Sequence, residues 1–132
     1  SPKKGFPIQI QKNQTLVDSK HFSPVIDGMW RVVNEAGGTA GLAKINGIDV
    51  CGKTGTVENF ISSVKQKNHS VFIAFAPMDN PQIAIAVFVE NAGFGGTWAA
   101  PIASLMIEKY LNKTISNPAK EKRILDAVLN KN

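Results

Sequence analysis

Apolar positions early in the chain follow the spacing of a helix. Between Val25 and Val33 they recur three or four residues apart, which places them on one helical face. Ser23 suits the N-cap of that helix and Pro24 suits its first position. The pair Gly37-Gly38 suits its end. The pattern predicts one helix between these signals, after an irregular lead-in over residues 1–21.

Three later segments have the composition of strands. The first runs from Ile48 to Val57, and the next two are Val71–Ala76 and Gln82–Glu90. A short connection bounded by Pro77 and Pro81 joins the last two, which predicts an antiparallel hairpin. The polar stretch 58–70 shows no clear period, so it is interpreted as a connection.

The strand predicted at 82–90 is apolar on both faces. Ile and Val occupy its odd positions, whereas Ala84, Ala86 and Phe88 occupy even ones. A strand of this kind is typical of the centre of a sheet that is covered on both sides. The alanines, with those of the preceding strand, are expected to let a helix approach closely.

Two helices are predicted after the strands. Thr97 suits the cap of the first, which runs to about Leu111 and tolerates Pro101 in its first turn. Its expected apolar residues are Trp98, Ile102, Leu105, Met106 and Leu111. Asn117-Pro118 starts the second, whose apolar stripe runs from Ile124 to Leu129.

This order of elements predicts an α+β fold, a three-stranded antiparallel meander with flanking helices. Residues 1–132 are interpreted as a single partial domain whose tail helix lies within 112–132. Hydrophobic residues make up 43% of the chain and charged residues 19%, which excludes an intrinsically disordered protein. The longest apolar run, Ile83 to Val89, is far shorter than the ~20 residues that span a bilayer. We therefore expect no leader and no membrane segment in this chain.

The net charge of +5 does not indicate a nucleic-acid-binding protein, because the basic residues are spread along the chain. Cys51 is the single cysteine, so an internal disulfide is excluded. Together with the two distant histidines, His21 and His69, it does not provide a suitable set of zinc ligands. We expect no metal and no cofactor. Cys51 is interpreted as a packing residue and the two histidines as exposed.

The segment Gly47–Thr54 matches the phosphate-binding P-loop pattern G-x-x-x-x-G-K-[ST] letter for letter. Its context argues against a nucleotide site. A P-loop needs a strand before its first glycine and a helix after its Thr, whereas here the intervening residues are strand-like and Gly55 follows. A P-loop nucleotide hydrolase remains one alternative, and a non-catalytic interaction domain is another.

Lys53-Thr54-Gly55-Thr56 also forms the K-T-G element of serine acyl-transfer enzymes that recognise β-lactams. On an edge strand its residue types suit that chemistry. The lysine supplies positive charge near a substrate carboxylate, and a hydroxyl of Thr54 or Thr56 can donate to that carboxylate. Gly55 leaves room beside the strand, and the next backbone amide can point at a developing oxyanion.

The sequence around this element is more specific than the element itself. Cys51–Glu58, the hairpin 75–84 that reads FAPMDNPQIA, and the strand end Val89-Glu90-Asn91 closely resemble the C-terminal part of class B penicillin-binding proteins. The resemblance runs from about Pro24 to Leu111 and is nearest to the penicillin-binding protein 2 type. It implies a peptidoglycan D,D-transpeptidase that cross-links stem peptides ending in D-Ala-D-Ala through a serine acyl-enzyme.

The resemblance also implies roles for individual residues. Lys53 becomes the catalytic and substrate-binding lysine, Thr54 and Thr56 bind the carboxylate of substrate or drug, and Gly55 is the spacer. The Thr56 amide becomes half of the oxyanion hole. The family implies a periplasmic enzyme at the bacterial inner membrane.

Two further family motifs do not support a complete site in this chain. No S-x-N triplet occurs, and S-x-x-K matches only at Ser62–Lys65, after the K-T-G, and at residues 1–4. Ser62 is therefore a poor candidate nucleophile. We expect the chain to be inactive alone. We also expect it to associate with the missing N-terminal part of the domain, or with itself, through an open sheet edge.

Overall fold

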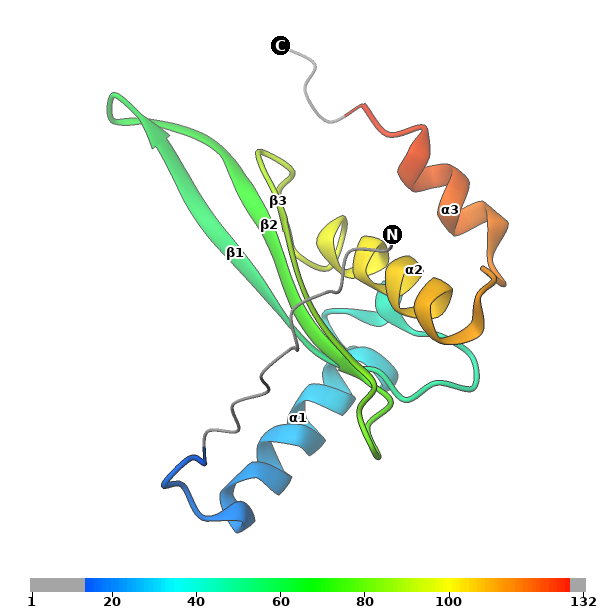
Figure 1. The fold of residues 1–132 in the computed structure, drawn as a ribbon. Helices are drawn as coiled ribbons and strands as arrows, with labels where there is room; N and C mark the ends of the chain where they lie inside the picture. The colour runs from blue at the N-terminus through cyan, green and yellow to red at the C-terminus, as the bar shows by residue number, and fades with distance from the viewer. Residues whose placement is uncertain (1–13, 129–132) are drawn as a thin grey trace, which may run out of the picture.

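The computed structural model describes residues 14–128. In chain order its elements are a 3₁₀ turn (Ser19–His21), α1 (Phe22–Asn34), a second 3₁₀ turn (Gly41–Ala43), β1 (Cys51–Ile61), β2 (Val64–Ala76), β3 (Ile83–Val89), α2 (Ala99–Asn112) and α3 (Pro118–Leu125). The strands form one antiparallel sheet in the order β1-β2-β3 (Figure 1). The predicted α+β meander with flanking helices is confirmed, and of the lead-in only residues from 14 onward are described.

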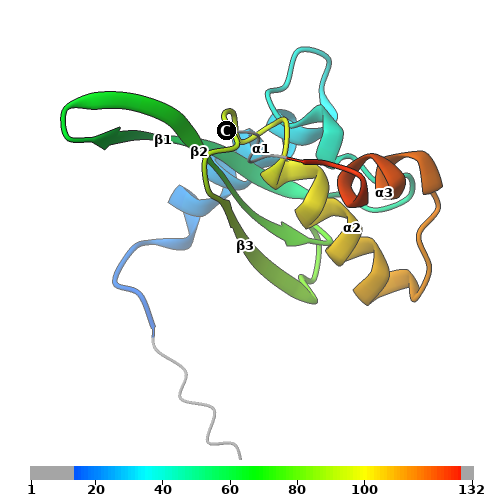
Figure 2. The ribbon, with the colours of Figure 1, turned by 90° about the horizontal axis from the view of Figure 1, so that it is seen from above.

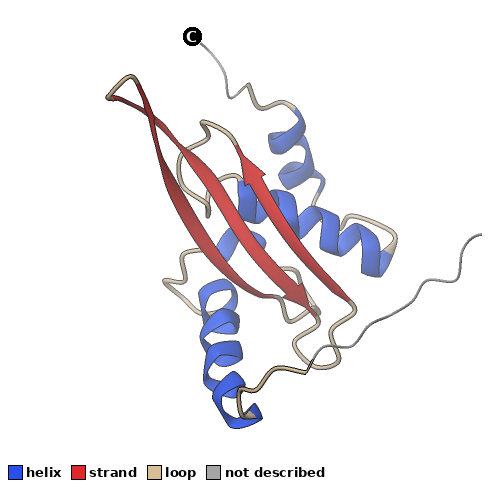
Figure 3. Ribbon diagram, turned by 60° about the vertical axis from the view of Figure 1, so that its left-hand side comes forward, coloured by secondary structure: helices blue, strands red, loops and turns tan. Residues whose placement is uncertain are grey.

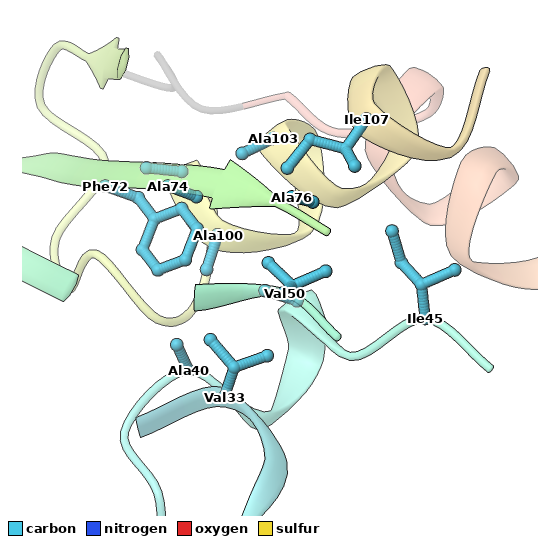
Figure 4. Packing of buried hydrophobic residues seen from close by; sticks show 12 residues of the cluster. Val33, Ala40, Ile45, Val50, Phe72, Ala74, Ala76, Ala100, Ala103 and Ile107 are labelled. Atoms are coloured by element: carbon cyan, nitrogen blue, oxygen red, sulfur yellow. The ribbon is translucent and has the colours of Figure 1, made fainter. Parts of the chain in front are cut away.

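Helix α2 crosses one face of the sheet, and α3 lies beyond it (Figure 3). The core between α2 and the sheet is built from small side chains around Phe72 and Ile107 (Figure 4). Ala74 pairs with Ile85 in the sheet register, so this alanine shares a face with the β3 isoleucines. The prediction that it shares a face with Ala84 and Ala86 was wrong. The alanines that let the helix approach are those of β2 and of α2 itself.

Strand β3 is an edge strand in the described part of the chain, not a central one. Its isoleucines and valines are half-buried beneath α2, whereas Ala84, Ala86 and Phe88 are exposed on the opposite face. Within residues 14–128 the predicted cover on that second face is therefore not present. The free edge agrees with the open sheet edge that the sequence predicts.

Strands β1 and β2 extend beyond the sheet as a long two-stranded ribbon (Figure 2). The sequence interpretation of 58–70 as a connection was wrong, because these residues pair as strands on both sides of a two-residue turn. Ser62 and Ser63 form that turn with φ angles of 49° and 68°. At the outer end of the ribbon, residues 60–65 are all exposed, so no alternation of polar and apolar residues marks this part of the strands.

Both long helices begin without the caps that the sequence suggests. Helix α1 starts at Phe22, directly after the 3₁₀ turn, so Ser23 and Pro24 lie within its first turn. Helix α2 starts at Ala99 with no side-chain cap from its own segment, so the prediction that Thr97 caps it was wrong. The amide of Ala99 instead donates to the hydroxyl of Ser70 on β2, 3.1 Å away.

Helix α2 turns a different face to the sheet from the one that its large apolar residues suggest. Ala99, Ala100 and Ala103 are fully buried there, whereas Met106 is 54% exposed. Three of the large residues, Ile102, Leu105 and Met106, instead line a groove between α2 and α3, whereas Leu111 packs against the core. Small side chains were needed against the sheet because they let the helix backbone come close.

Helix α3 begins at the predicted place, with the side chain of Asn117 capping the amide of Lys120. Lys120 ties the helix to the body, since its Nζ donates to Ser104 Oγ at 3.0 Å and to the carbonyl of Lys44 at 3.1 Å. Burial lowers the pKa of Lys120. Leu129, at the end of the predicted apolar stripe, lies outside the described residues. No helix within residues 14–128 is long and apolar enough to cross a bilayer.

Candidate active site

The K-T-G element lies on β1, the strand at the other edge of the sheet from β3. Helix α1 holds the start of this strand, because the Asn34 side chain donates to the carbonyl of Val50 at 2.9 Å. Trp30 adds a second contact, its indole N–H lying 2.9 Å from the carboxylate of Asp49. The motif therefore starts from a fixed point at the junction of helix and sheet.

Alternation along β1 divides the motif between two faces. Thr54 pairs with Phe72 of β2, and Thr56 pairs with Ser70, so both threonines lie on the face that α2 covers. Lys53 pairs with Ile73 and lies on the opposite, open face. Its Nζ donates to the carbonyl oxygen of Thr54 at 2.8 Å, and the side chain is exposed.

The two threonines line a cleft of about 660 Å³. Its walls are the loop after α1, the start of the second 3₁₀ turn and the segment 94–97, with Phe94 71% exposed. The residues of the described chain that line this cleft are Gly38, Thr39, Gly41, Leu42, Thr54, Thr56, Phe94, Gly95, Gly96 and Thr97. None of these ten is charged, so hydroxyl groups and backbone amides supply its polar contacts. Phe94 forms one wall of the cleft, and Lys53 is not part of the lining.

The glycines at 95 and 96 let the segment 94–97 lie directly on the sheet. A Cβ on Gly95 would collide with the carbonyl oxygens of Val71 and Gly55, and one on Gly96 would collide with that of Thr39. The segment therefore reaches this position only because both side chains are absent. The predictions from the sequence did not include this close approach.

Ser70 of β2 fixes the segment 94–97 by hydrogen bonding. Its hydroxyl, fully buried, donates to the carbonyl of Phe94 at 2.9 Å and accepts from the amide of Ala99 at 3.1 Å. One side chain of β2 thereby fixes both the cleft wall and the first turn of α2. Nothing in the local sequence around position 70 indicates this role.

Residues 8–108 match the family model described as the penicillin binding protein transpeptidase domain. The chain belongs to this family. It is 37% identical over 100 residues to peptidoglycan D,D-transpeptidase MrdA of Haemophilus influenzae, an alignment that covers 67% of this chain and 15% of the relative. It is 33% identical over 104 residues to penicillin-binding protein 2B of Streptococcus pneumoniae, covering 76% of this chain and 15% of that protein. The chain thus spans a small part of the length of these curated relatives.

Solved structures of the penicillin-binding family share the fold. That of penicillin-binding protein 2 from Pseudomonas aeruginosa matches with a TM-score of 0.63 and 35% identity, covering 76% of this chain and 22% of that one. That of penicillin-binding protein 2B from Streptococcus pneumoniae matches with a TM-score of 0.64 and 31% identity, covering 83% of this chain and 19% of that one. The sequence resemblance to this family is confirmed.

The P-loop alternative is not favoured in a transpeptidase-family chain of this structure. A P-loop needs the first turn of a helix at Lys53 and Thr54, whereas here β1 continues through both residues to Ile61. The relatives are D,D-transpeptidases, which are enzymes, so the interaction-domain alternative gains no support either.

Ser62 lies in the turn at the tip of the ribbon, about 30 Å along β1 from Lys53 at ~3.3 Å per residue. The structure therefore does not bring this serine to the K-T-G. The other S-x-x-K match, at residues 1–4, lies outside the described residues.

Cys51 is fully buried, which confirms it as a packing residue, and burial raises the pKa of its thiol to about 11. His21 is exposed as expected, but His69 is half-buried and its Nδ1 accepts from the amide of Asn91 at 3.1 Å. Within residues 14–128, no group of three His, Cys, Asp or Glu side chains is arranged to hold a metal ion.

Proposed function

We propose that this chain is the C-terminal, K-T-G-bearing part of a penicillin-sensitive peptidoglycan D,D-transpeptidase. The full protein would transfer the acyl group of stem peptides ending in D-Ala-D-Ala through a serine acyl-enzyme and so cross-link the cell wall. The observation that carries this proposal is the K-T-G on an edge strand with two threonines facing a cleft, in a chain of the transpeptidase family.

In this proposal Thr54 and Thr56 donate hydrogen bonds from the cleft to the carboxylate of a substrate or β-lactam. A carboxylate is an acceptor only, so hydroxyl donors suit it. Lys53 adds positive charge from the other face of β1, which a ligand lying along the strand edge can reach. Gly55 leaves space for that ligand, and the amide of Thr56 forms half of the oxyanion hole.

The nucleophile comes from the remainder of the parent protein, so the isolated chain is inactive. The same remainder, the N-terminal part of the transpeptidase domain, would cover the exposed face of β3 at Ala84, Ala86 and Phe88 and pair with the free edge of that strand. Without it, the edge favours self-association of the chain. Analytical ultracentrifugation that shows a monomer at high concentration would contradict this part of the proposal.

The relatives are bacterial enzymes named for peptidoglycan and penicillin. We accordingly place the parent protein at the periplasmic face of the inner membrane, with a role in cell shape, held there by a segment other than those described. Fractionation of cells that express a tagged parent protein tests this location.

Labelling with a fluorescent penicillin tests the central proposal. The parent protein should form a covalent band and the isolated chain should not. In the parent, Lys53→Ala should slow acylation by about 100-fold or more, the range for loss of one electrostatic contact to the transition state. Lys67→Ala, an exposed lysine on the neighbouring strand, is the matched control and should label at the normal rate.

A parent protein that takes up no label would contradict the proposed function. Normal labelling of Lys53→Ala, with an unchanged melting temperature, would contradict the role of the lysine alone.

A further inference from the structure

The hydroxyl of Thr39 lies 3.0 Å from the hydroxyl of Thr54, within hydrogen-bond distance. The two residues come from different elements, Thr39 from the loop after α1 and Thr54 from the K-T-G strand. Both line the same cleft. The contact therefore joins a residue that no motif marks to the proposed carboxylate-binding hydroxyl.

The backbone on either side of Thr39 is anchored to the end of α1. The amide of Gly38 donates to the carbonyl of Glu35 at 3.1 Å, and the amide of Ala40 donates to the carbonyl of Val32 at 3.0 Å. Ala40 is fully buried in the core. Thr39 thus stands at a fixed place although its side chain faces the open cleft.

The segment 94–97, which contains Gly95 and Gly96, also restrains Thr39. The carbonyl oxygen of Thr39 occupies the space that a Cβ on Gly96 would need, and Thr54 Cγ2 would lie 3.8 Å from the same Cβ. Thr39, Thr54 and Gly96 are therefore packed as one group. A side chain held in this way can orient its neighbour.

We propose, on the basis of the function proposed above, that Thr39 is a positioning residue for Thr54. Each hydroxyl carries one hydrogen, so only one of the two can donate within the pair. When Thr39 donates, the hydrogen of Thr54 is free to point at a bound carboxylate. An accepted hydrogen bond also polarises Thr54 and makes it a better donor.

Donation from Thr39 to Thr54 is favoured once a carboxylate is bound beside Thr54. The carboxylate has no proton to donate, so the hydrogen between it and Thr54 has to come from Thr54. Without Thr39, the hydroxyl of Thr54 would sample its staggered rotamers and meet the ligand less often in the productive one. Thr39 acts in this way through Thr54 and does not itself touch the ligand's carboxylate.

The test uses the parent protein and the acylation rate with a fluorescent penicillin, which carries a carboxylate. Thr39→Val keeps the side-chain shape and removes the hydroxyl, and it should lower the second-order rate constant by about 5- to 10-fold, the scale of one hydrogen bond. Thr39→Ser is the matched control, because it restores the hydroxyl, and it should react within about twofold of the natural protein.

A double-substitution cycle separates positioning from a general structural effect. In a Thr54→Val background, Thr39→Val should cause no further loss, because its target is gone. An equal loss in both backgrounds would overturn the proposal, as would failure of Thr39→Ser to restore the rate at an unchanged melting temperature.

Failure of this inference is distinguishable from failure of the proposed function. A normal rate for Thr39→Val, together with slow acylation of Thr54→Val, would overturn the role of Thr39 and leave the role of Thr54 intact. A normal rate for Thr54→Val would overturn both.

Discussion

Replacement of Ser70 by alanine should destabilise the protein more than any change of similar size at its surface. Ser70 is fully buried on β2, and its hydroxyl makes two hydrogen bonds, to the carbonyl of Phe94 and from the amide of Ala99. Alanine removes both. The buried amide of Ala99 is then left without a side-chain partner, whereas the carbonyl of Phe94 still accepts from the amide of Thr97 at 3.0 Å. One unsatisfied buried donor costs about 1–3 kcal/mol, and the lost hydrogen bond to Phe94 costs about 1 kcal/mol more.

We expect a total loss of about 2–4 kcal/mol in the free energy of unfolding, the sum of these two costs. The volume change is a single oxygen atom, so the cavity term is minor. The effect is also local. The amide of Ala99 begins α2 with no other side-chain cap, so the first turn of the helix and the segment 94–97 should loosen together.

Two measurements on the parent protein check this expectation. Chemical denaturation gives the loss in free energy, and hydrogen exchange followed by mass spectrometry reports faster exchange in peptides that span 94–102. Ser23→Ala is the matched control, because Ser23 is exposed in the first turn of α1, and it should change the stability by less than about 0.5 kcal/mol. Equal, small effects of the two substitutions would refute the assigned role of Ser70.

Three further predictions follow from the local geometry. Gly96→Ala should lower both the melting temperature and the acylation rate, because the new Cβ would collide with the carbonyl oxygen of Thr39. Gly28→Ala is the control on α1, where the new Cβ meets no other atom, and it should raise the free energy of unfolding by about 0.5–1 kcal/mol in thermal denaturation. Cys51 should resist thiol reagents until the protein unfolds. Burial raises the pKa of its thiol from 9.0 to about 11, so between these two pH values the folded protein keeps the proton that the unfolded chain loses. The free energy of unfolding should therefore fall as the pH rises from about 9 to about 11, which denaturation at several pH values would measure. Changing Ser62 and Ser63 to Asn-Gly should raise stability by about 0.5–1 kcal/mol, because both positions have positive φ, and should leave penicillin labelling unchanged.

The parts of the fold that the sequence predicts are those in which one local pattern decides the structure. The hairpin 71–90 has continuous apolar strands and a proline-bounded connection, and it forms as expected. The ribbon at 58–70 could not be predicted from a local pattern of this kind. Its two strands are held together by their backbone pairing. Because residues 60–65 at its outer end are exposed on both faces, neither polarity nor period distinguishes them from a loop.

The contacts that build the cleft could not be predicted, because each one joins residues that are far apart along the chain. Ser70 caps a helix that begins 29 positions later, and Thr39 meets Thr54 across 15 positions. Local sequence contains only half of each pair. The K-T-G was identifiable because its four residues are consecutive, whereas the groups that hold them in place come together only in the folded chain.

The function proposed for the K-T-G requires an edge strand, because its residues are divided between two faces of β1. Consecutive strand residues point to opposite sides, so Lys53 and Thr54 cannot both face a ligand that rests on either surface of the sheet. They can both reach a ligand that lies along the outer edge, where no neighbouring strand of the described chain intervenes. The same edge presents the backbone groups of β1 that do not pair with β2. In the proposed site, the lysine, the two hydroxyls and the Thr56 amide can act on one ligand only because β1 has no second partner in the described chain. A strand added at this edge would exclude that ligand without changing any of these residues.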